Sequence, residues 1–156
     1  MKNLPKLLTS IIGCELVGIA ATPFTLSAIP TWYQYLNKPF FSPPNLVFGP
    51  VWTMLYFLMG VAAYMVWIKD LRKKEVKIAL SFFIAQLVFN FLWSILFFGL
   101  HSPILGMIDI VILWILIFIT ITKFYKISKT AAHLLIPYIA WVTFATILNF
   151  CILRLN

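Results

Sequence analysis

Charged residues are what this sequence has least of. Lysine, arginine, aspartate and glutamate make up 10% of its 156 residues, only four residues are acidic, and 63% are hydrophobic. So few polar side chains cannot cover the surface of a water-soluble globule. The composition therefore excludes that class and predicts a protein that lies within a lipid bilayer.

Cysteine and the common signatures of catalysis are also scarce. We expect no disulfide between Cys14 and Cys151, because they should lie at opposite depths of the membrane. His101 and His133 form no metal-site spacing with each other or with the cysteines, so we expect no bound metal, although axial haem ligation by His133 stays open. Without a P-loop, zinc or Gly-x-Ser-x-Gly motif, any reaction must take its reactivity from a ligand, and enzymatic activity stays an open question.

Long apolar runs with at most one charged residue are abundant, and each exceeds the roughly 20 residues that cross a bilayer as a helix or comes close to that length. The predicted spans are residues 7–29, 46–68, 78–100, 104–122 and 131–153. The runs are continuously apolar rather than alternating, which excludes a β-barrel. The first contains Glu15 and lacks a small-residue cleavage site, so we expect a retained span. The predicted fold is all-α, a single domain over residues 1–156 forming an integral membrane bundle of five transmembrane helices.

The basic residues predict how the bundle is oriented. The opposite side carries only Lys38 and Arg154, while ten basic residues share the side of the N-terminus: Lys2, Lys6, Lys69, Arg72, Lys73, Lys74, Lys77, Lys123, Lys126 and Lys129. By the positive-inside rule the N-terminus is cytoplasmic and the C-terminus lies outside. The formal net charge of +8 thus indicates topology and contact with membrane lipid, and we expect no nucleic-acid partner.

A stiff loop precedes the second span. Pro39, Pro43 and Pro44 restrict its backbone, so residues 30–45 are predicted to form a lid on the outer side. Asn45 is the expected N-cap of the second span, and Ser102 that of the fourth.

Three predicted spans each carry a face of aromatic, polar and small side chains. These faces comprise Trp52, Tyr56, Met59, Ala63 and Trp67; Gln86, Asn90, Trp93 and Phe97; and Tyr138, Trp141, Ala145, Leu148 and Asn149. One interpretation is helix packing, with the amides hydrogen-bonded across helices. For Trp52, Trp93 and Trp141 we favour a ligand cleft, because they lie several residues inside the membrane beside polar groups.

Two acidic residues fall inside predicted spans. An ionised carboxylate there costs at least about 2.5 kcal/mol, so Glu15 and Asp109 should face the bundle interior and be protonated. Asp109 could serve a structural hydrogen bond or a proton or ligand contact, and both hypotheses stay open.

The segment WYQYLNKPFFSPPNLVFGPVWTMLYFLMGVAAYMVW, followed by QLVFNFLW, FFG and PYIAWVTFATILN, resembles the tryptophan-rich sensory protein family. This family is the bacterial counterpart of the mitochondrial translocator protein, also called the peripheral benzodiazepine receptor. The resemblance covers nearly the whole chain and implies five helices around a pocket, commonly in a homodimer in the bacterial cell membrane. It also implies tetrapyrrole, sterol and benzodiazepine-type ligands.

By this resemblance a ligand pocket maps onto residues of four spans and the lid: Tyr33, Pro43, Val51, Trp52, Asn90, Trp93, Leu105, Ile108, Trp141, Ala145 and Leu148. Lys38 and His101 are candidate partners for the carboxylate edge of a porphyrin. Phe150 replaces the tyrosine of the family's sterol motif, which makes sterol binding doubtful, and Phe41 stands where many relatives carry tryptophan.

The function this implies is capture of protoporphyrin-like tetrapyrroles and their light-driven oxidative breakdown. Trp52 and Trp141 are the candidate photochemical residues, positioned to donate electrons or intercept radicals, and the tetrapyrrole is a ligand or substrate rather than an obligatory cofactor. A transporter of porphyrins or lipids is the alternative, although no inverted repeat is evident. A sensor whose loaded form engages a partner is a third hypothesis.

Overall fold

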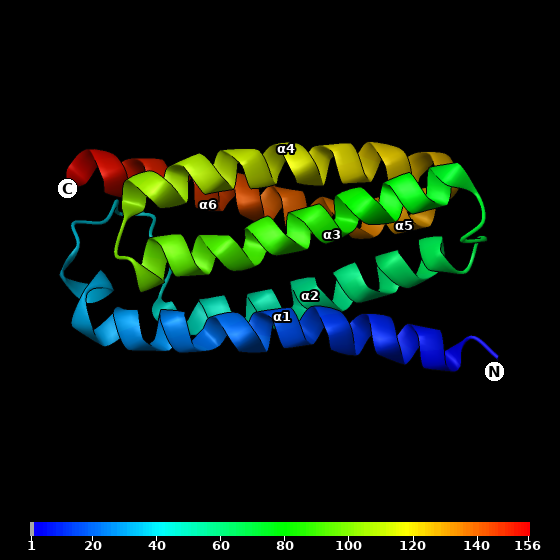
Figure 1. The fold of residues 1–156 in the computed structure, drawn as a ribbon. Coiled ribbons are helices and arrows are strands. Elements are labelled where there is room, and N and C mark those ends of the chain that lie inside the picture. Colours follow the sequence, from blue (N-terminus) through cyan, green and yellow to red (C-terminus); the bar gives the residue numbers. More distant parts are fainter. Residues whose placement is uncertain (1) are drawn as a thin grey trace.

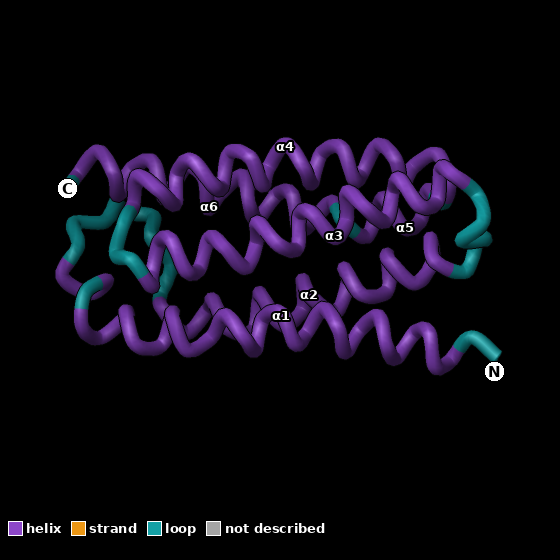
Figure 2. The backbone as a smooth tube through the Cα atoms, viewed as in Figure 1, coloured by secondary structure: helices purple, strands orange, loops and turns teal. Residues whose placement is uncertain are grey.

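Five membrane-length helical segments run side by side along one long axis in the computed structural model, which describes residues 2–156 (Figures 1 and 2). In chain order the elements are α1 (Leu4–Thr31), η1 (Tyr33–Tyr35), α2 (Asn45–Trp67), α3 (Lys74–Ser94), η2 (Ile95–Gly99), α4 (Pro103–Ile127), α5 (Lys129–Leu134) and α6 (Ile136–Leu155). The predicted all-α fold class is confirmed.

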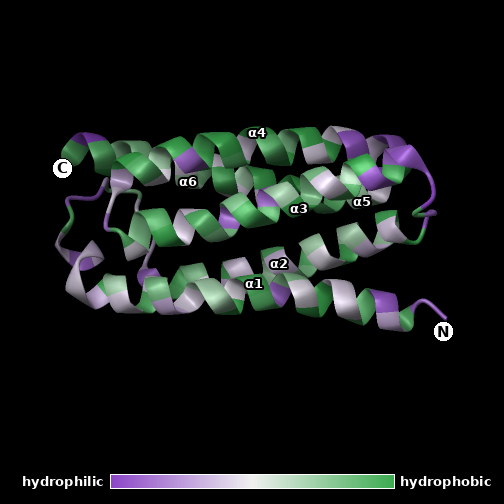
Figure 3. Ribbon diagram, in the orientation of Figure 1, coloured by the Kyte–Doolittle hydropathy of each residue, from purple (hydrophilic) through white to green (hydrophobic). Residues whose placement is uncertain are grey.

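The outside of the bundle is as apolar as its inside. Large hydrophobic side chains such as Ile12 (55% exposed), Phe118 (51%) and Ile108 (57%) point outward. Figure 3 shows apolar residues along the bundle and hydrophilic ones gathered towards the end that carries the N-terminus. An apolar exterior of this length is stable only against lipid, so the chain is an integral membrane protein.

The connection between α1 and α2 is shorter than predicted. Helix α1 continues through Pro30 to Thr31, and the short 3-10 helix η1 follows, so the irregular part is confined to residues 36–44. Asn45 is not an N-cap, because the extended backbone of Pro44 makes Pro44 the flanking residue and Asn45 the first helical one. The predicted cap of α4 is confirmed, since the Ser102 hydroxyl accepts a hydrogen bond from the Leu105 amide at 3.2 Å.

Two of the predicted spans are not continuous α-helices. The third ends in the π-helical turn η2, and the fifth is divided at Leu135 into α5 and α6. Pro137 lies in the first turn of α6, where a missing amide hydrogen is tolerated, and it restricts the backbone just before it.

Small residues let α1 lie close to α2. A Cβ atom on Gly60 would stand 2.6 Å from the Cα of Ile11, and one on Gly18 would stand 2.5 Å from the ring of Tyr56. The Ser10 hydroxyl also donates a 2.7 Å hydrogen bond to the Gly60 carbonyl. Close approach through small residues and hydroxyl bonds to the backbone are typical of membrane helix pairs.

The loop is tied to its surroundings by polar contacts. The Lys38 ammonium donates to the carbonyls of Tyr33 (2.9 Å) and Leu36 (3.2 Å) and lies over the Tyr33 ring. The Asn37 amide donates to Asn156 Oδ1 at 3.1 Å, and Asn156 Nδ2 donates back to the Asn37 carbonyl at 2.9 Å. These bonds join the loop to the end of α6.

Candidate ligand-binding cavity

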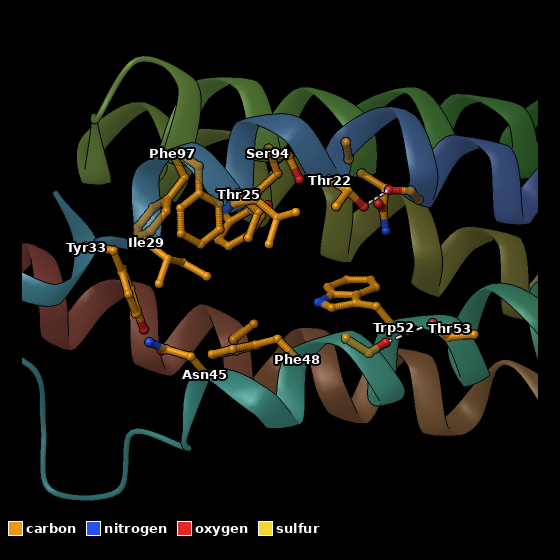
Figure 4. Close-up of a pocket in the computed structure, with 18 of the residues that line it drawn as sticks. Thr22, Thr25, Ile29, Tyr33, Asn45, Phe48, Trp52, Thr53, Ser94 and Phe97 are labelled. Atoms are coloured by element: carbon orange, nitrogen blue, oxygen red, sulfur yellow. Dashed lines mark hydrogen bonds between the residues drawn. The ribbon is translucent and has the colours of Figure 1, made fainter. Parts of the chain in front are cut away.

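A cavity of about 390 Å³ lies between α1, α2, α3 and α6, in the half of the bundle away from the N-terminus, and none of the loop residues 36–44 lines it. Its size falls within the roughly 300–1,000 Å³ of small-molecule sites. Figure 4 shows side chains from several helices converging on it. The lining residues are Glu15, Gly18, Ile19, Ala21, Thr22, Thr25, Leu26, Ile29, Tyr33, Asn45, Leu46, Phe48, Gly49, Trp52, Thr53, Tyr56, Asn90, Trp93, Ser94, Phe97, Phe98, Trp141, Ala145, Leu148, Asn149 and Ile152.

Eight aromatic side chains line the cavity. The Trp52 ring packs 5.6 Å from that of Tyr56, centroid to centroid, and Trp93 stacks on Phe97 at 4.9 Å with 14° between the planes. Trp141 meets Phe48 edge-on at 6.1 Å. These contacts fix the ring orientations and leave a mostly apolar space that suits a flat, hydrophobic ligand.

Two buried amides and two tyrosines form a hydrogen-bonded chain at the floor. The Tyr56 hydroxyl donates to Asn90 Oδ1 (2.5 Å), Asn90 Nδ2 donates to the Tyr138 hydroxyl (2.7 Å), and that hydroxyl donates to Gln86 Oε1 (2.6 Å). Each of these side chains is at most 5% exposed. The expectation that the amides bond across helices is confirmed, because the chain links α2, α3 and α6.

Asn149 makes a second link across the helices. The Trp93 indole donates to Asn149 Oδ1 at 3.1 Å, and Asn149 Nδ2 donates to the Pro103 carbonyl at 2.9 Å. The same amide oxygen would lie 3.0 Å from a Cβ atom placed on Gly106, so α4 can approach only because that residue is glycine. One amide therefore orients the indole of α3 and holds the beginning of α4 against α6.

Hydroxyl and amide groups line the upper part of the cavity. In Figure 4 the side chains of Tyr33 and Asn45 point towards one another at the mouth. Burial raises the pKa of the Tyr33 phenol, and a hydrogen bond with Ser42 partly opposes this rise, so the phenol stays neutral at physiological pH. The hydroxyls of Thr22 and Thr53 donate to backbone carbonyls of their own helices.

The proposed carboxylate partners lie outside this lining. Lys38 is engaged by loop carbonyls, and the exposed His101 stacks on Trp32 with ring centroids 4.8 Å apart. His101 also has a φ of 53°, a backbone conformation that is uncommon for residues other than glycine. A ligand would have to displace existing contacts to reach either residue.

The sequence-predicted site residues divide into two groups. Those that line the cavity are Tyr33, Trp52, Asn90, Trp93, Trp141, Ala145 and Leu148. Those that do not are Pro43, Val51, Leu105 and Ile108. On α4, Leu105 and Ile108 are 39% and 57% exposed, whereas Gly106 and Asp109 face the interior. The contacts of all these residues with a ligand stay predictions.

Sequence reasoning missed the wall that α1 provides. Gly18, Thr22, Thr25 and Ile29 line the cavity and recur at helical spacing, but they form no aromatic stripe. A face of small and hydroxylated residues in an otherwise bulky apolar helix was the available signal.

The two intramembrane carboxyl groups have different surroundings. Glu15 is half-buried and lines the cavity, whereas Asp109 is 3% exposed within the bundle. Asp109 Oδ2 is buried and has no hydrogen-bond partner within residues 2–156. The structural hydrogen bond, which was one of the two hypotheses for Asp109, is therefore not formed by Oδ2 within residues 2–156.

The fold and the cavity define an all-helical integral membrane protein with a ligand-sized pocket lined by aromatic side chains. The model of the TspO/MBR family matches residues 10–155, so the chain belongs to that family. It is 46% identical to the Tryptophan-rich protein TspO of Archaeoglobus fulgidus over 99% of both chains. It is 38% identical to the Tryptophan-rich sensory protein of Cereibacter sphaeroides, covering 96% of this chain and 90% of the relative. The Translocator protein of Homo sapiens is also 38% identical, over 80% of this chain and 75% of that protein.

Proposed function

We propose that this protein binds planar tetrapyrroles such as protoporphyrin, and benzodiazepine-type ligands, in the aromatic cavity, and promotes light-dependent oxidative breakdown of the porphyrin. The observation that carries the proposal is the convergence of Trp52, Trp93 and Trp141 from three helices on one cavity. Family membership and the printed names of the sensory and translocator relatives agree with a ligand-responsive membrane protein.

The cavity suits a porphyrin because of its two kinds of surface. Indole and phenyl rings provide faces and edges on which an aromatic macrocycle can stack. Hydroxyl and amide groups near the mouth, including those of Tyr33 and Asn45, can donate hydrogen bonds to its carboxylate edge. Orientation therefore follows from an apolar interior and a more polar entrance.

In the proposed reaction the porphyrin itself absorbs the light and dioxygen is the oxidant. Addition of both oxygen atoms across one methine double bond breaks that bond and leaves two carbonyl groups, so no other electron donor is required. Trp52 and Trp141 hold the macrocycle in the orientation in which dioxygen adds to this bond, so their replacement should slow the reaction even where binding is kept. The protein supplies position and exclusion rather than acid–base groups.

The proposal includes a setting for this reaction. The protein lies in a bacterial cell membrane as a homodimer, with its N-terminus in the cytoplasm and the loop outside. The distribution of basic residues supports this orientation, since ten of the twelve belong to the side of the N-terminus. Accessibility of single introduced cysteines from each side of sealed vesicles tests it.

Illumination of the purified protein with protoporphyrin tests the reaction. We expect Trp52→Phe and Trp141→Phe to keep binding, measured from the shift of the porphyrin absorption band, and to slow the light-dependent loss of that band several-fold. Trp114→Phe is the matched control, because Trp114 lies outside the cavity and bonds Thr143 at 2.8 Å. Unchanged decay in both cavity variants, with binding retained, refutes the photochemical role.

Transport of porphyrins or lipids is the alternative. The buried chain of Tyr56, Asn90, Tyr138 and Gln86 closes the floor, which counts against passage along the bundle. Protein-dependent movement of porphyrin into liposomes in darkness supports transport over degradation, and its absence counts against transport.

A further inference from the structure

A second hollow lies between α1 and α3, with Ala63 and Trp67 of α2 in its lining, in the half of the molecule nearer the N-terminus. Its volume is about 810 Å³, and it opens to the outside of the bundle. The lining is almost wholly apolar: Thr9, Ser10, Gly13, Cys14, Leu16, Val17, Ala20, Ala63, Trp67, Leu80, Phe83, Ile84, Leu87, Val88, Phe91 and Leu92. We call it the α1/α3 groove.

The length of the groove matches one acyl chain. From Leu80 to Phe91 along α3 the rise is about 16 Å at 1.5 Å per residue. One leaflet contributes about 15 Å, half of the roughly 30 Å hydrocarbon core. Where the groove ends, the ring of Phe24 meets that of Phe91 edge-on at 6.2 Å, and the two helices close on each other.

Small side chains leave the space open. A Cβ atom placed on Gly13 would meet nothing within 4 Å, so this glycine faces empty space rather than a neighbouring helix. Ser10, Ala20 and Ala63 are the other small residues of the lining. The groove therefore has room for an apolar chain from the surrounding bilayer.

The open end of the groove is basic. The Lys6 ammonium lies 5.6 Å from the ring centroid of Trp67, which lines the groove. Helical spacing places Lys6 one turn before Thr9 and Ser10, and Lys77 one turn before Leu80, so both lysines share the faces that form the walls. The nearby acidic Asp70 is paired with Arg72 at 3.2 Å and does not neutralise them.

We propose that the α1/α3 groove is a binding site for one anionic phospholipid. One acyl chain lies along the groove with its methyl end at Phe24 and Phe91, and the phosphate lies between Lys6 and Lys77. The groove is apolar over the depth of one leaflet and has lysines at its open end. It therefore complements both the shape of an acyl chain and the negative charge of a phosphate. The site is separate from the aromatic cavity and does not depend on the function proposed for it.

Native mass spectrometry of the full chain in detergent, with equal amounts of dioleoylphosphatidylglycerol and dioleoylphosphatidylcholine, tests the site. We expect one tightly held phosphatidylglycerol per chain. Lys6→Gln with Lys77→Gln should weaken this binding roughly 25-fold, about fivefold for each lysine. Lys123→Gln with Lys126→Gln, which removes the same charge from α4, a helix that does not line the groove, should leave the binding unchanged.

Filling the groove gives an independent test. Gly13→Phe should abolish the retained lipid, whereas Ile12→Phe, which adds an aromatic ring at the adjacent, outward-facing position, should not. Retention of the lipid by Gly13→Phe, or an unchanged lipid preference in the Lys6 and Lys77 variant, overturns the proposal. The proposal is also overturned if Gly13→Phe dissociates a dimer but keeps its lipid, because a second copy of the chain would then be the occupant of the groove.

Discussion

Replacing Asn90 by leucine removes the centre of the buried hydrogen-bonded chain at nearly constant volume. The Tyr138 hydroxyl keeps its bond to Gln86, but the Tyr56 hydroxyl, which donates to Asn90 at 2.5 Å, loses its acceptor. Two hydrogen bonds within a membrane contribute about 0.6 kcal/mol each. One stranded buried donor costs about 1–3 kcal/mol. Together these contributions predict that Asn90→Leu lowers the unfolding free energy by about 2–4 kcal/mol, most of it from the stranded Tyr56 donor.

A double-mutant cycle isolates that cause. Tyr56→Phe removes the stranded hydroxyl, so the double variant Tyr56→Phe/Asn90→Leu should be more stable than Asn90→Leu alone. Reversible unfolding in mixed detergent micelles, followed by circular dichroism, gives the free energies. Phe83→Leu, at a buried position of α3 without a polar group, is the control for the loss of packing alone.

Two outcomes would refute this reasoning. Stability of Asn90→Leu within about 0.5 kcal/mol of the unmodified protein would mean that the chain adds nothing beyond packing. A double variant no more stable than Asn90→Leu would mean that the Tyr56 hydroxyl finds another partner, such as a group in the cavity that it lines.

Three further substitutions probe contacts between the helices. Gly60→Ala should destabilise the protein by about 1–3 kcal/mol in thermal unfolding, because its Cβ would meet the Ile11 backbone at 2.6 Å. Gly13→Ala, with open space at the same helix pair, should instead be neutral or stabilising by up to about 1 kcal/mol. Trp93→Phe should cost about 1 kcal/mol through loss of the 3.1 Å bond to Asn149, and an unchanged melting temperature would show that the bond is not stabilising.

Hydropathy was sufficient to predict the helical bundle. Each span needs about 20 apolar residues and tolerates almost no charge, so the runs could be recognised without tertiary information. The helix ends were less predictable, because a proline inside α1, a π-helical turn after α3 and a break before Pro137 depend on local hydrogen bonds. Asn45 was predicted to be the N-cap of this helix, but the extended backbone of Pro44 places the cap one residue earlier.

Residue spacing predicted which faces of α2, α3 and α6 turn inward but not which residues of α4 do so. Amides and tryptophans at helical spacing mark a face because burying them without partners is costly. On α4 the apolar residues surround the helix, so Leu105 and Ile108 could not be distinguished from inward-facing neighbours by periodicity. The resemblance placed them in the pocket, whereas here they lie outside the cavity lining.

The two hollows of this bundle differ in a way that assigns them different occupants. The cavity near the loop has its polar groups distributed between a hydrogen-bonded floor and a hydroxyl-lined entrance, which can orient a ligand bearing polar groups at one edge. The α1/α3 groove has an apolar wall throughout and cations only at its open end. A site that selects one small molecule needs polar groups at defined positions, whereas a site for an acyl chain needs only sufficient length and an apolar surface. Gly13→Phe should therefore remove the retained lipid without changing the proposed porphyrin binding, whereas Trp52→Phe should slow the light-dependent loss of porphyrin without changing lipid retention.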